Sequence, residues 1–373
     1  MKRRDFLKAL GCSAVGLGLP GMLQGKERAD KPEKPNVLFI ISDDLNTALS
    51  GFGHPQCKTP ELDKLAARGV KFQNMHCQYP VCGASRASIM SGLYPYTNRT
   101  MGNQGTLRRS MPDVLTMSQL FRNNGYHAGR VSKIYHMRIP MEIISGTSDC
   151  DDRHSWDEAV NVKAPEQHAP GEKTHWSPKD KGSQTFLGVQ AAGDDMVHAD
   201  GKAAEHAIKF LKKNKNGKKP FFLAVGFVRP HVPLVAPKKY FDRYDRGAMQ
   251  RPKVPDNDLD DVPQIIRSYK RNSSTYGVTP ELHKGLLQAY YASVSYMDAQ
   301  VGRVLKALAD EGLDDNTIVV FTSDHGYLLG HHNKFQKQHL FEEATRVPFI
   351  VSVPWMKKHR GKATDKITEL IDL

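Results

Sequence analysis

Apolar residues along the chain fall into short unbroken runs and into longer stretches with helical spacing. Strands covered on both faces of a sheet are predicted from the unbroken runs at residues 36–41, 221–228 and 317–322. Helices are predicted from apolar residues with helical spacing at residues 60–69, 114–125, 199–213 and 280–311. Because such strands and helices alternate along the chain, the pattern predicts an α/β fold, an α/β/α sandwich around a large, mostly parallel mixed sheet.

Two long segments between these elements have no clear period, at residues 145–193 and 251–279. Both are rich in Asp, Pro, Lys and Ser, and loops of this length in compact domains usually carry function. We therefore expect them to contribute walls of a substrate pocket. A basic run at residues 212–219 is interpreted as a solvated turn between a helix and a strand rather than as a polyanion site.

The first 25 residues have the order of a twin-arginine signal peptide. The pair Arg3-Arg4 comes just before Phe6, and a weakly apolar, glycine-rich stretch follows at residues 9–23. We expect a signal peptide at residues 1–25, a linker at residues 26–35 and a folded domain at residues 36–373. The expected partner is the twin-arginine (Tat) export machinery, and the expected location is periplasmic or secreted in a bacterium. No later apolar run reaches the ~18 residues that span a bilayer, so no membrane span is expected after cleavage.

The composition of the chain shows an excess of basic over acidic residues. The chain of 373 residues has 39% hydrophobic and 25% charged residues, which excludes a disordered acidic tail and a polytopic membrane protein. Its net charge is +13. Four basic residues and one aspartate in residues 1–25 contribute +3, which leaves +10 for the remainder. Such an excess favours anionic partners in general, and does not distinguish nucleic acid, acidic lipid and sulfated or carboxylated polymers.

Four cysteines follow the predicted signal peptide: Cys57, Cys77, Cys82 and Cys150. In an oxidising compartment they could form two disulfides, although their spacing is irregular. If one of them is used for chemistry, an odd number is left and at least one thiol stays free. No CxxC pair and no zinc-binding spacing is present in the sequence.

Acidic residues follow two of the predicted strands directly. Asp43 and Asp44 come after the first strand, and Asp324 with His325 comes after the last one. Open α/β sheets bind ligands at the carboxyl ends of their strands, and crowded carboxylates need a cation between them. Each pair alone could be a helix N-cap, but together they predict a metal site.

The segment Cys82-Gly83-Ala84-Ser85-Arg86 opens a predicted helix and continues to Ser91-Gly92. A cysteine at a helix N-terminus beside an arginine has a lowered pKa and lies where backbone N–H groups meet anions. Taken alone, it would be a reactive thiol or a small buried residue. The segment resembles the sulfatase signature, in which Cys is followed by any residue, then Pro or Ala, then Ser and Arg.

Other segments resemble the same family in the same order, from Asn36 to the last residue. They are residues 36–44, Lys133-Ile134-Tyr135-His136, Arg229-Pro230-His231-Val232-Pro233, Ser323-Asp324-His325-Gly326 and Lys337. The resemblance is strongest to the iduronate-2-sulfatase branch of this family, which belongs to the alkaline-phosphatase superfamily. It implies a sulfatase catalytic domain over residues 36–373. Because the family normally continues into a smaller C-terminal subdomain, a chain truncated at its C-terminus is expected.

The resemblance implies that Cys82 is converted to formylglycine (3-oxoalanine) by a formylglycine-generating maturation enzyme. The hydrated aldehyde, a geminal diol, is then the nucleophile that attacks sulfur. Growing charge on the sulfate needs cations aimed at it beforehand, and these are Arg86, Lys133 and Lys337.

Two histidines and one metal ion complete the implied site. His231 is expected to protonate the leaving oxygen and His136 to act on the diol, although the two roles are interchangeable at this point. The ion is expected to be one Ca²⁺. Its implied ligands are Asp43, Asp44, Asp324, an oxygen on residue 82 and His325.

The resemblance further implies hydrolysis of sulfate esters, in particular the 2-O-sulfate of a uronic-acid-containing polysaccharide or oligosaccharide. Nucleic acid is not expected as a partner. Tyr327 is a candidate sugar contact. One alternative is a phosphatase or phosphonate monoester hydrolase of the same superfamily, although those phosphatases place Thr or Ser where Cys82 stands. Another is a non-catalytic, polyanion-binding homologue that kept the fold.

Overall fold

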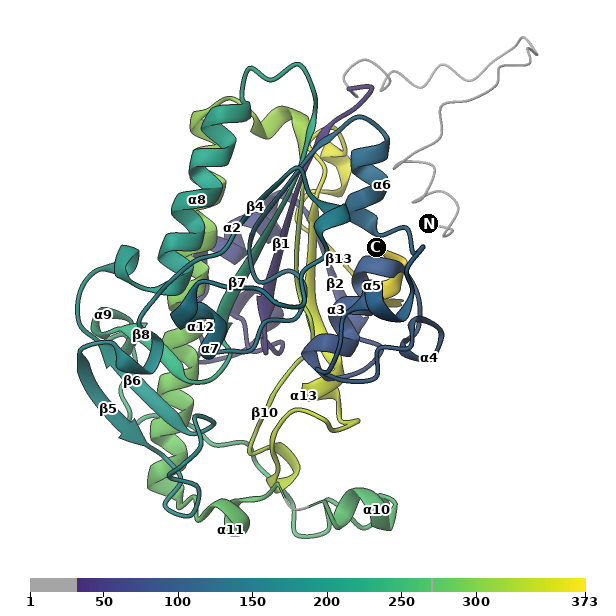
Figure 1. Ribbon diagram of the computed structural model, residues 1–373. Coiled ribbons are helices and arrows are strands. Elements are labelled where there is room, and N and C mark those ends of the chain that lie inside the picture. The colour runs from purple at the N-terminus through teal and green to yellow at the C-terminus, as the bar shows by residue number, and fades with distance from the viewer. Residues whose placement is uncertain (1–31, 270) are drawn as a thin grey trace. The chain divides into compact units, whose positions relative to one another are not determined.

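The three predicted strands lie side by side at the centre of one eight-stranded sheet (Figure 1). The computed structural model describes residues 32–269 and 271–373. From edge to edge the sheet contains β13 (Lys362–Glu369), β2 (Val70–His76), β12 (Arg346–Ser352), β9 (Thr317–Ser323), β1 (Asn36–Asp43), β7 (Phe221–Pro230), β3 (His127–Ser132) and β4 (Glu158–Val160). Within this sheet only β12 runs antiparallel to its neighbours, so the expected mostly parallel mixed sheet is confirmed.

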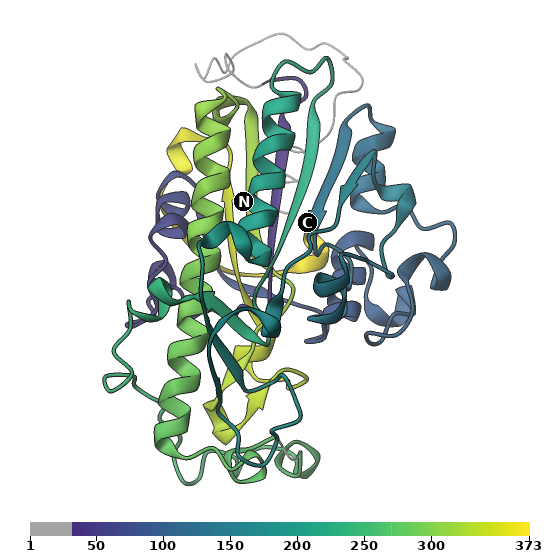
Figure 2. The same ribbon diagram turned by 60° about the vertical axis from the view of Figure 1, so that its left-hand side comes forward.

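Helices cover both faces of the sheet, as Figure 2 shows. Successive side chains of β1 enter opposite apolar clusters, with Leu38 and Ile40 in one cluster and Phe39 in the other. The first cluster packs against α2 (Pro60–Arg68), α8 (Ala199–Asn214) and α12 (Pro280–Asp310). The second packs against α3 (Cys82–Ser91) and α6 (Met117–Asn123). Each large aliphatic side chain buried in these layers stabilises the fold by about 1.5–3 kcal/mol. Because β1 is apolar on both faces, helices must cover both faces of the sheet, which gives three layers.

The remaining elements are short. The shorter helices are α4 (Pro95–Asn98), α5 (Leu107–Ser110), α7 (Met141–Ser145), α9 (Lys238–Phe241), α10 (Gln264–Arg267), α11 (Ser273–Tyr276) and α13 (Glu342–Thr345). A three-stranded sheet contains β5 (Gly171–His175), β6 (Leu187–Ala191) and β8 (Leu234–Pro237), and a two-stranded sheet contains β10 (Leu328–Leu329) and β11 (Phe335–Gln336).

The segments predicted to lack regular structure only partly do so. Residues 145–193 contain the three short strands β4, β5 and β6, so the prediction is wrong there. These strands have three to five residues each, and β5 is largely exposed, which leaves no alternating apolar pattern to read. In the part of residues 251–279 that the structure describes, the only helices are the four-residue α10 and α11. The basic turn between α8 and β7 is confirmed.

The predicted signal peptide at residues 1–25 lies outside the described residues, as does most of the predicted linker. Residues 34–373 form one compact unit. Among the residues that the structure describes, no helix combines the length and the apolar character that crossing a bilayer requires.

The four cysteines of the folded domain are not paired in disulfides. Cys57 and Cys77 are buried in different apolar clusters, on opposite faces of the sheet, which excludes a bond between them. Cys150 is half-buried. The possibility of two disulfides is therefore wrong for this structure, and Cys82 is available for chemistry.

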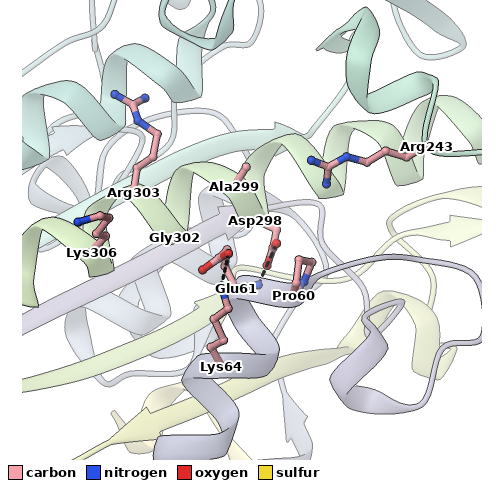
Figure 3. Close-up of a pocket in the computed structure, with 9 residues that line it drawn as sticks. All are labelled: Pro60, Glu61, Lys64, Arg243, Asp298, Ala299, Gly302, Arg303 and Lys306. Carbon is pink, nitrogen blue, oxygen red and sulfur yellow. Dashed lines mark hydrogen bonds and ion pairs between the residues drawn. The ribbon is translucent and has the colours of Figure 1, made fainter.

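A cavity of about 400 Å³ lies between the start of α2 and α12 (Figure 3). None of its lining residues is a predicted site residue. Its lining residues are Pro60, Glu61, Lys64, Arg243, Asp298, Ala299, Gly302, Arg303 and Lys306. The buried Asp298 carboxylate accepts hydrogen bonds from the backbone N–H groups of Glu61 (3.1 Å) and Leu62 (2.8 Å). Asp298 therefore satisfies the first free donors of α2 and occupies the anion position at this helix end.

Asp298 is expected to lower the stability of the protein as the pH rises toward neutrality. Burial raises the pKa of Asp298 from 3.8 to about 7, against the opposing effect of its two backbone hydrogen bonds. The folded protein keeps this proton at pH values where the unfolded chain has lost it. The stability it contributes is therefore complete below about pH 4 and lost as the pH rises to about 7.

Urea unfolding between about pH 5 and about pH 8 checks this expectation. The substitution Asp298→Asn should remove a fall in unfolding free energy of up to about 1.4 kcal/mol per pH unit. Equal pH slopes in the two proteins would contradict the prediction.

Candidate active site

The two acidic motifs meet at the carboxyl ends of two central strands of the sheet. β1 and β9 are parallel neighbours with Ser42 opposite Ser323, so the residues that follow them emerge together. The backbone N–H of Asp44 donates to Asp324 Oδ1 at 3.2 Å. Asp44 has a φ of 63°, a left-handed conformation that aspartate tolerates better than most residues. This turn holds the Asp43 and Asp44 side chains, both fully buried, at the same site.

The helix α3 brings the signature cysteine to these carboxylates. Cys82 is the first residue of α3 and is completely buried. A Cβ atom at Gly83 would lie 2.2 Å from the Gly102 carbonyl oxygen, so only glycine fits there. The Gly83 N–H donates to Asn103 Oδ1 at 2.8 Å. The Asn103 loop therefore packs directly on the first turn of the helix.

Arg86 lies one helical turn after Cys82 and binds both acidic motifs. Its Nε donates to Asp324 Oδ2 at 2.8 Å, and its Nη2 lies 3.6 Å from Asp43 Oδ1. Its Nη1 donates to the carbonyl oxygens of Lys133 (2.6 Å) and Ile134 (3.0 Å). The planar guanidinium thus joins β1, β9 and the segment after β3, which a lysine could not do.

Two lysines reach the site from different elements. Lys133 follows β3, and its Nζ pairs with Asp43 Oδ2. Lys337 follows β11, and its Nζ lies 2.6 Å from Asp44 Oδ1 and 3.1 Å from Cys82 Sγ. Burial lowers the pKa of Lys337, but Asp44 and Cys82 raise it well above its ordinary value, so Lys337 is positively charged.

Three histidines surround Cys82. His325 Nε2 lies 3.2 Å from Cys82 Sγ and 3.4 Å from Asp44 Oδ1, while its Nδ1 lies 2.9 Å from the Gly326 carbonyl. His136 neighbours Cys82, and burial lowers the pKa of His136 against the raising effect of Cys82. His231 Nε2 lies 3.8 Å from Asp44 Oδ2, and its side chain is 13% exposed. His231 is therefore at the solvent side of the site.

The charges at the site favour anions at residue 82. Burial raises the pKa of the Cys82 thiol, but Lys337, Lys133 and His325 lower it well below the ordinary value. Burial raises the pKa of Asp324 to about 6, against the effect of Arg86. The same cations that stabilise a thiolate can stabilise the negative oxygens of a tetrahedral anion.

The acidic cluster fits a divalent cation. Two of its buried carboxylate oxygens, Asp43 Oδ1 and Asp44 Oδ2, have no hydrogen-bond partner. One potential ligand atom from each of Asp43, Cys82, Asp324 and His325 lies within 4.8 Å of the others. Asp43, Asp44, Cys82 and His231 form a second such group. A cation bound here would satisfy oxygens whose burial is otherwise costly.

The structure brings together the site residues that the sequence predicted. They are Asp43, Asp44, Cys82, Arg86, Lys133, His136, His231, Asp324, His325 and Lys337. The sequence analysis missed Asn103, which contacts the signature helix. Tyr327 is 5% exposed and stacks on Tyr290, and its role as a sugar contact stays a prediction.

Comparison with known proteins gives a consistent picture. The family model described as Sulfatase matches residues 35–373. A sulfatase of Formosa agariphila is 34% identical over an alignment that covers 100% of this chain and 73% of the relative. The mouse iduronate 2-sulfatase (Mus musculus) is also 34% identical, over 95% of this chain and 64% of the relative. The chain thus spans just under two thirds of the length of that relative.

A solved structure shows the same fold. The phosphonate monoester hydrolase of Agrobacterium radiobacter superposes with a TM-score of 0.70 at 22% identity, over 91% of this chain and 72% of that chain. At this identity the likeness supports the fold alone. It agrees with the predicted α/β/α sandwich.

Proposed function

This chain belongs to the sulfatase family, and from that premise we propose that it hydrolyses sulfate esters at Cys82. The observation that carries the proposal is the arrangement around Cys82 Sγ, which lies 3.1 Å from Lys337 Nζ and 3.2 Å from His325 Nε2. Arg86 lies one turn further along the same helix. Cations on several sides of one buried nucleophile suit the attack on an anionic ester.

We propose that Cys82 acts as formylglycine after oxidation by a maturation enzyme. The sulfur atom in the structure marks the position that an oxygen of the hydrated aldehyde would take. When formed, this group supplies a nucleophilic hydroxyl, and it releases sulfate when the aldehyde is restored. Lys337 and His325 would then contact the reacting oxygen directly.

The two histidines differ in a way that supports separate roles. His136 is buried and neighbours residue 82, so we assign it to the proton of the nucleophile. His231 lies at the solvent side, facing Asp44, and we assign it to protonation of the leaving alcohol. The Nδ1 of His231 lies 2.6 Å from the Val232 carbonyl, which leaves Nε2 to face the substrate.

We propose one Ca²⁺ as the resident cation. Asp43, Asp44 and Asp324 would supply oxygen ligands, with His325 beside them. Carboxylate oxygens are the ligands that calcium prefers. When bound, the cation would withdraw charge from a sulfate oxygen.

Calcium is expected to stabilise protein that has been treated with a chelator. At about 100 times its dissociation constant, the ion should raise the unfolding free energy by about 2.7 kcal/mol. The substitution Asp44→Asn should remove this rise, and the exposed Asp245→Asn should keep it. Thermal unfolding with Ca²⁺, Mg²⁺, Mn²⁺ and Zn²⁺ in parallel measures the preference. A larger rise with Zn²⁺ than with Ca²⁺ would contradict the calcium assignment.

As substrate we propose the 2-O-sulfate of a uronic-acid-containing polysaccharide or oligosaccharide. The support is the 34% identity to the mouse iduronate 2-sulfatase and the net positive charge of the chain. The pair Arg3-Arg4 supports export through the Tat machinery to the periplasm or beyond.

Turnover of matched esters tests the proposed function. The matured protein should release sulfate from 2-O-sulfated uronate disaccharides at least about tenfold faster than from the 6-O-sulfated isomers, a difference of about 1.4 kcal/mol in activation free energy. Faster turnover of a phosphate or phosphonate ester than of its sulfate analogue would favour the phosphohydrolase alternative. No turnover of any ester would favour a polyanion-binding protein.

A further inference from the structure

The loop that carries His231 is held by a buried arginine. Arg229 and Pro230 end β7, residues 231–233 connect it to β8, and Pro230 lies opposite Asp43 in the sheet register. Pro230 and Pro233 have no backbone N–H, so this loop has few donors of its own. Arg229 Nη1 instead donates to the carbonyl oxygens of His231 (2.6 Å) and Pro233 (2.7 Å). One side chain therefore fixes both sides of the loop that presents His231.

Arg229 is itself fixed on three sides. Its Nη2 lies 2.5 Å from Glu166 Oε2, and both side chains are 1% exposed. The Asp200 carboxylate accepts hydrogen bonds from the backbone N–H groups of Val228 (2.7 Å) and Arg229 (3.0 Å). Ser42 Oγ donates to the Arg229 carbonyl at 2.7 Å, directly before Asp43 in the chain. Glu166 therefore holds the guanidinium, while Asp200 and Ser42 hold the backbone of Arg229.

The backbone of Glu166 has an unusual conformation. It has a φ of 49°, in the left-handed region that a glutamate rarely adopts. Such a backbone persists only where surrounding contacts enforce it, and these are often at functional sites. Its segment comes from residues 145–193, so part of this long connection contacts Arg229 and, through it, the loop that carries His231.

We propose that Arg229 is a positioning residue that orients His231 for protonation of the leaving alcohol, with Glu166 as its counter-ion. This inference rests on the proposed function. Without the guanidinium, the carbonyl groups of His231 and Pro233 lose their shared donor. The loop is then less firmly held, and the imidazole moves with it because its Nδ1 contacts the Val232 carbonyl of the same loop. Arg229 contacts neither the nucleophile nor the acidic cluster, so binding of the sulfate group should be unaffected.

Two substrates with different leaving groups distinguish loss of general-acid catalysis by His231 from a general loss of structure. A sugar alcohol is a poor leaving group and needs a proton from a general acid, which contributes about 10²–10⁴-fold. A nitrophenolate leaves readily without one. The variants Arg229→Gln and Glu166→Gln are compared on a 2-O-sulfated uronate disaccharide and on 4-nitrophenyl sulfate, each with kcat and KM measured separately.

For Arg229→Gln, we expect kcat on the disaccharide to fall about 100-fold, with a fall of less than about threefold on the aryl ester and little change in either KM. Glu166→Gln should show the same selective loss to a smaller extent, and it serves as the test if Arg229→Gln does not fold. Equal losses on both esters, or none, would overturn the assignment while leaving the proposed function intact. A wild-type protein that hydrolyses neither ester would overturn both.

Arg108 provides a matched control. Its Nη1 also donates to two carbonyl oxygens, those of Pro112 (2.9 Å) and Val114 (2.6 Å), and its Nη2 pairs with Asp152 at 2.7 Å. This arginine has the same kind of contacts but holds a segment without site residues. Arg108→Gln should leave the ratio of the two kcat values unchanged. A changed ratio in this control would contradict the special role of Arg229.

Discussion

Replacing Cys82 by alanine is expected to lower kcat for sulfate-ester hydrolysis by at least about 10⁴-fold, as loss of a covalent nucleophile does in other enzymes. The contacts of Lys337 and His325 converge on Cys82 Sγ, so the substitution removes the atom that they serve. It also removes the side chain that would be converted to formylglycine. Turnover of 4-nitrophenyl sulfate by purified protein, with circular dichroism to verify folding, measures the loss.

Cys150→Ala is the control, because Cys150 is half-buried and outside the acidic cluster. It should keep the wild-type kcat. The tryptic peptide of residues 72–86 should be lighter by about 18 Da after co-expression with a formylglycine-generating system, the change from a thiol to an aldehyde at the nucleophile. Because this peptide also contains Cys77, fragment ions must assign the loss to Cys82. More than a tenth of wild-type activity in Cys82→Ala would contradict the proposal.

The sequence predicts the centre of the fold because β1, β7 and β9 are apolar on both faces. These strands are buried between two layers of helices, so each contains a run of apolar residues and the pattern is easy to recognise. By contrast, β2 is largely half-buried and contains polar residues, and β5 is mostly exposed, so neither has a clear pattern. Strands of this kind are stabilised by neighbours distant in the chain, which local pattern does not reveal.

The sequence predicts those site residues that directly follow a clearly apolar strand or begin a helix. Asp43 and Asp324 are examples, because parallel β1 and β9 necessarily end together. The role of Arg229 was not predictable, since it depends on Glu166, which lies 63 residues away in an irregular segment. The different surroundings of His136 and His231 likewise depend on packing and not on spacing.

Replacing Arg86 by leucine is expected to lower the free energy of unfolding by about 3–5 kcal/mol in the presence of a chelator. Asp43 and Asp324 are fully buried, and Arg86 pairs with both of them. Its loss leaves buried carboxylates with less countercharge, and it leaves the Lys133 and Ile134 carbonyl groups without this donor. Urea unfolding of the two proteins measures the difference.

Calcium should reduce that difference, because a cation between the carboxylates replaces part of the lost positive charge. A leucine that merely fitted poorly in the core would cost the same free energy with and without the ion. Arg122→Leu is the control. Arg122 forms an ion pair with Asp157 in which both side chains are about a third exposed, and its loss should cost less than about 1 kcal/mol. A loss for Arg86→Leu no larger than this, or one that calcium does not change, would mean that Arg86 does not balance the acidic cluster.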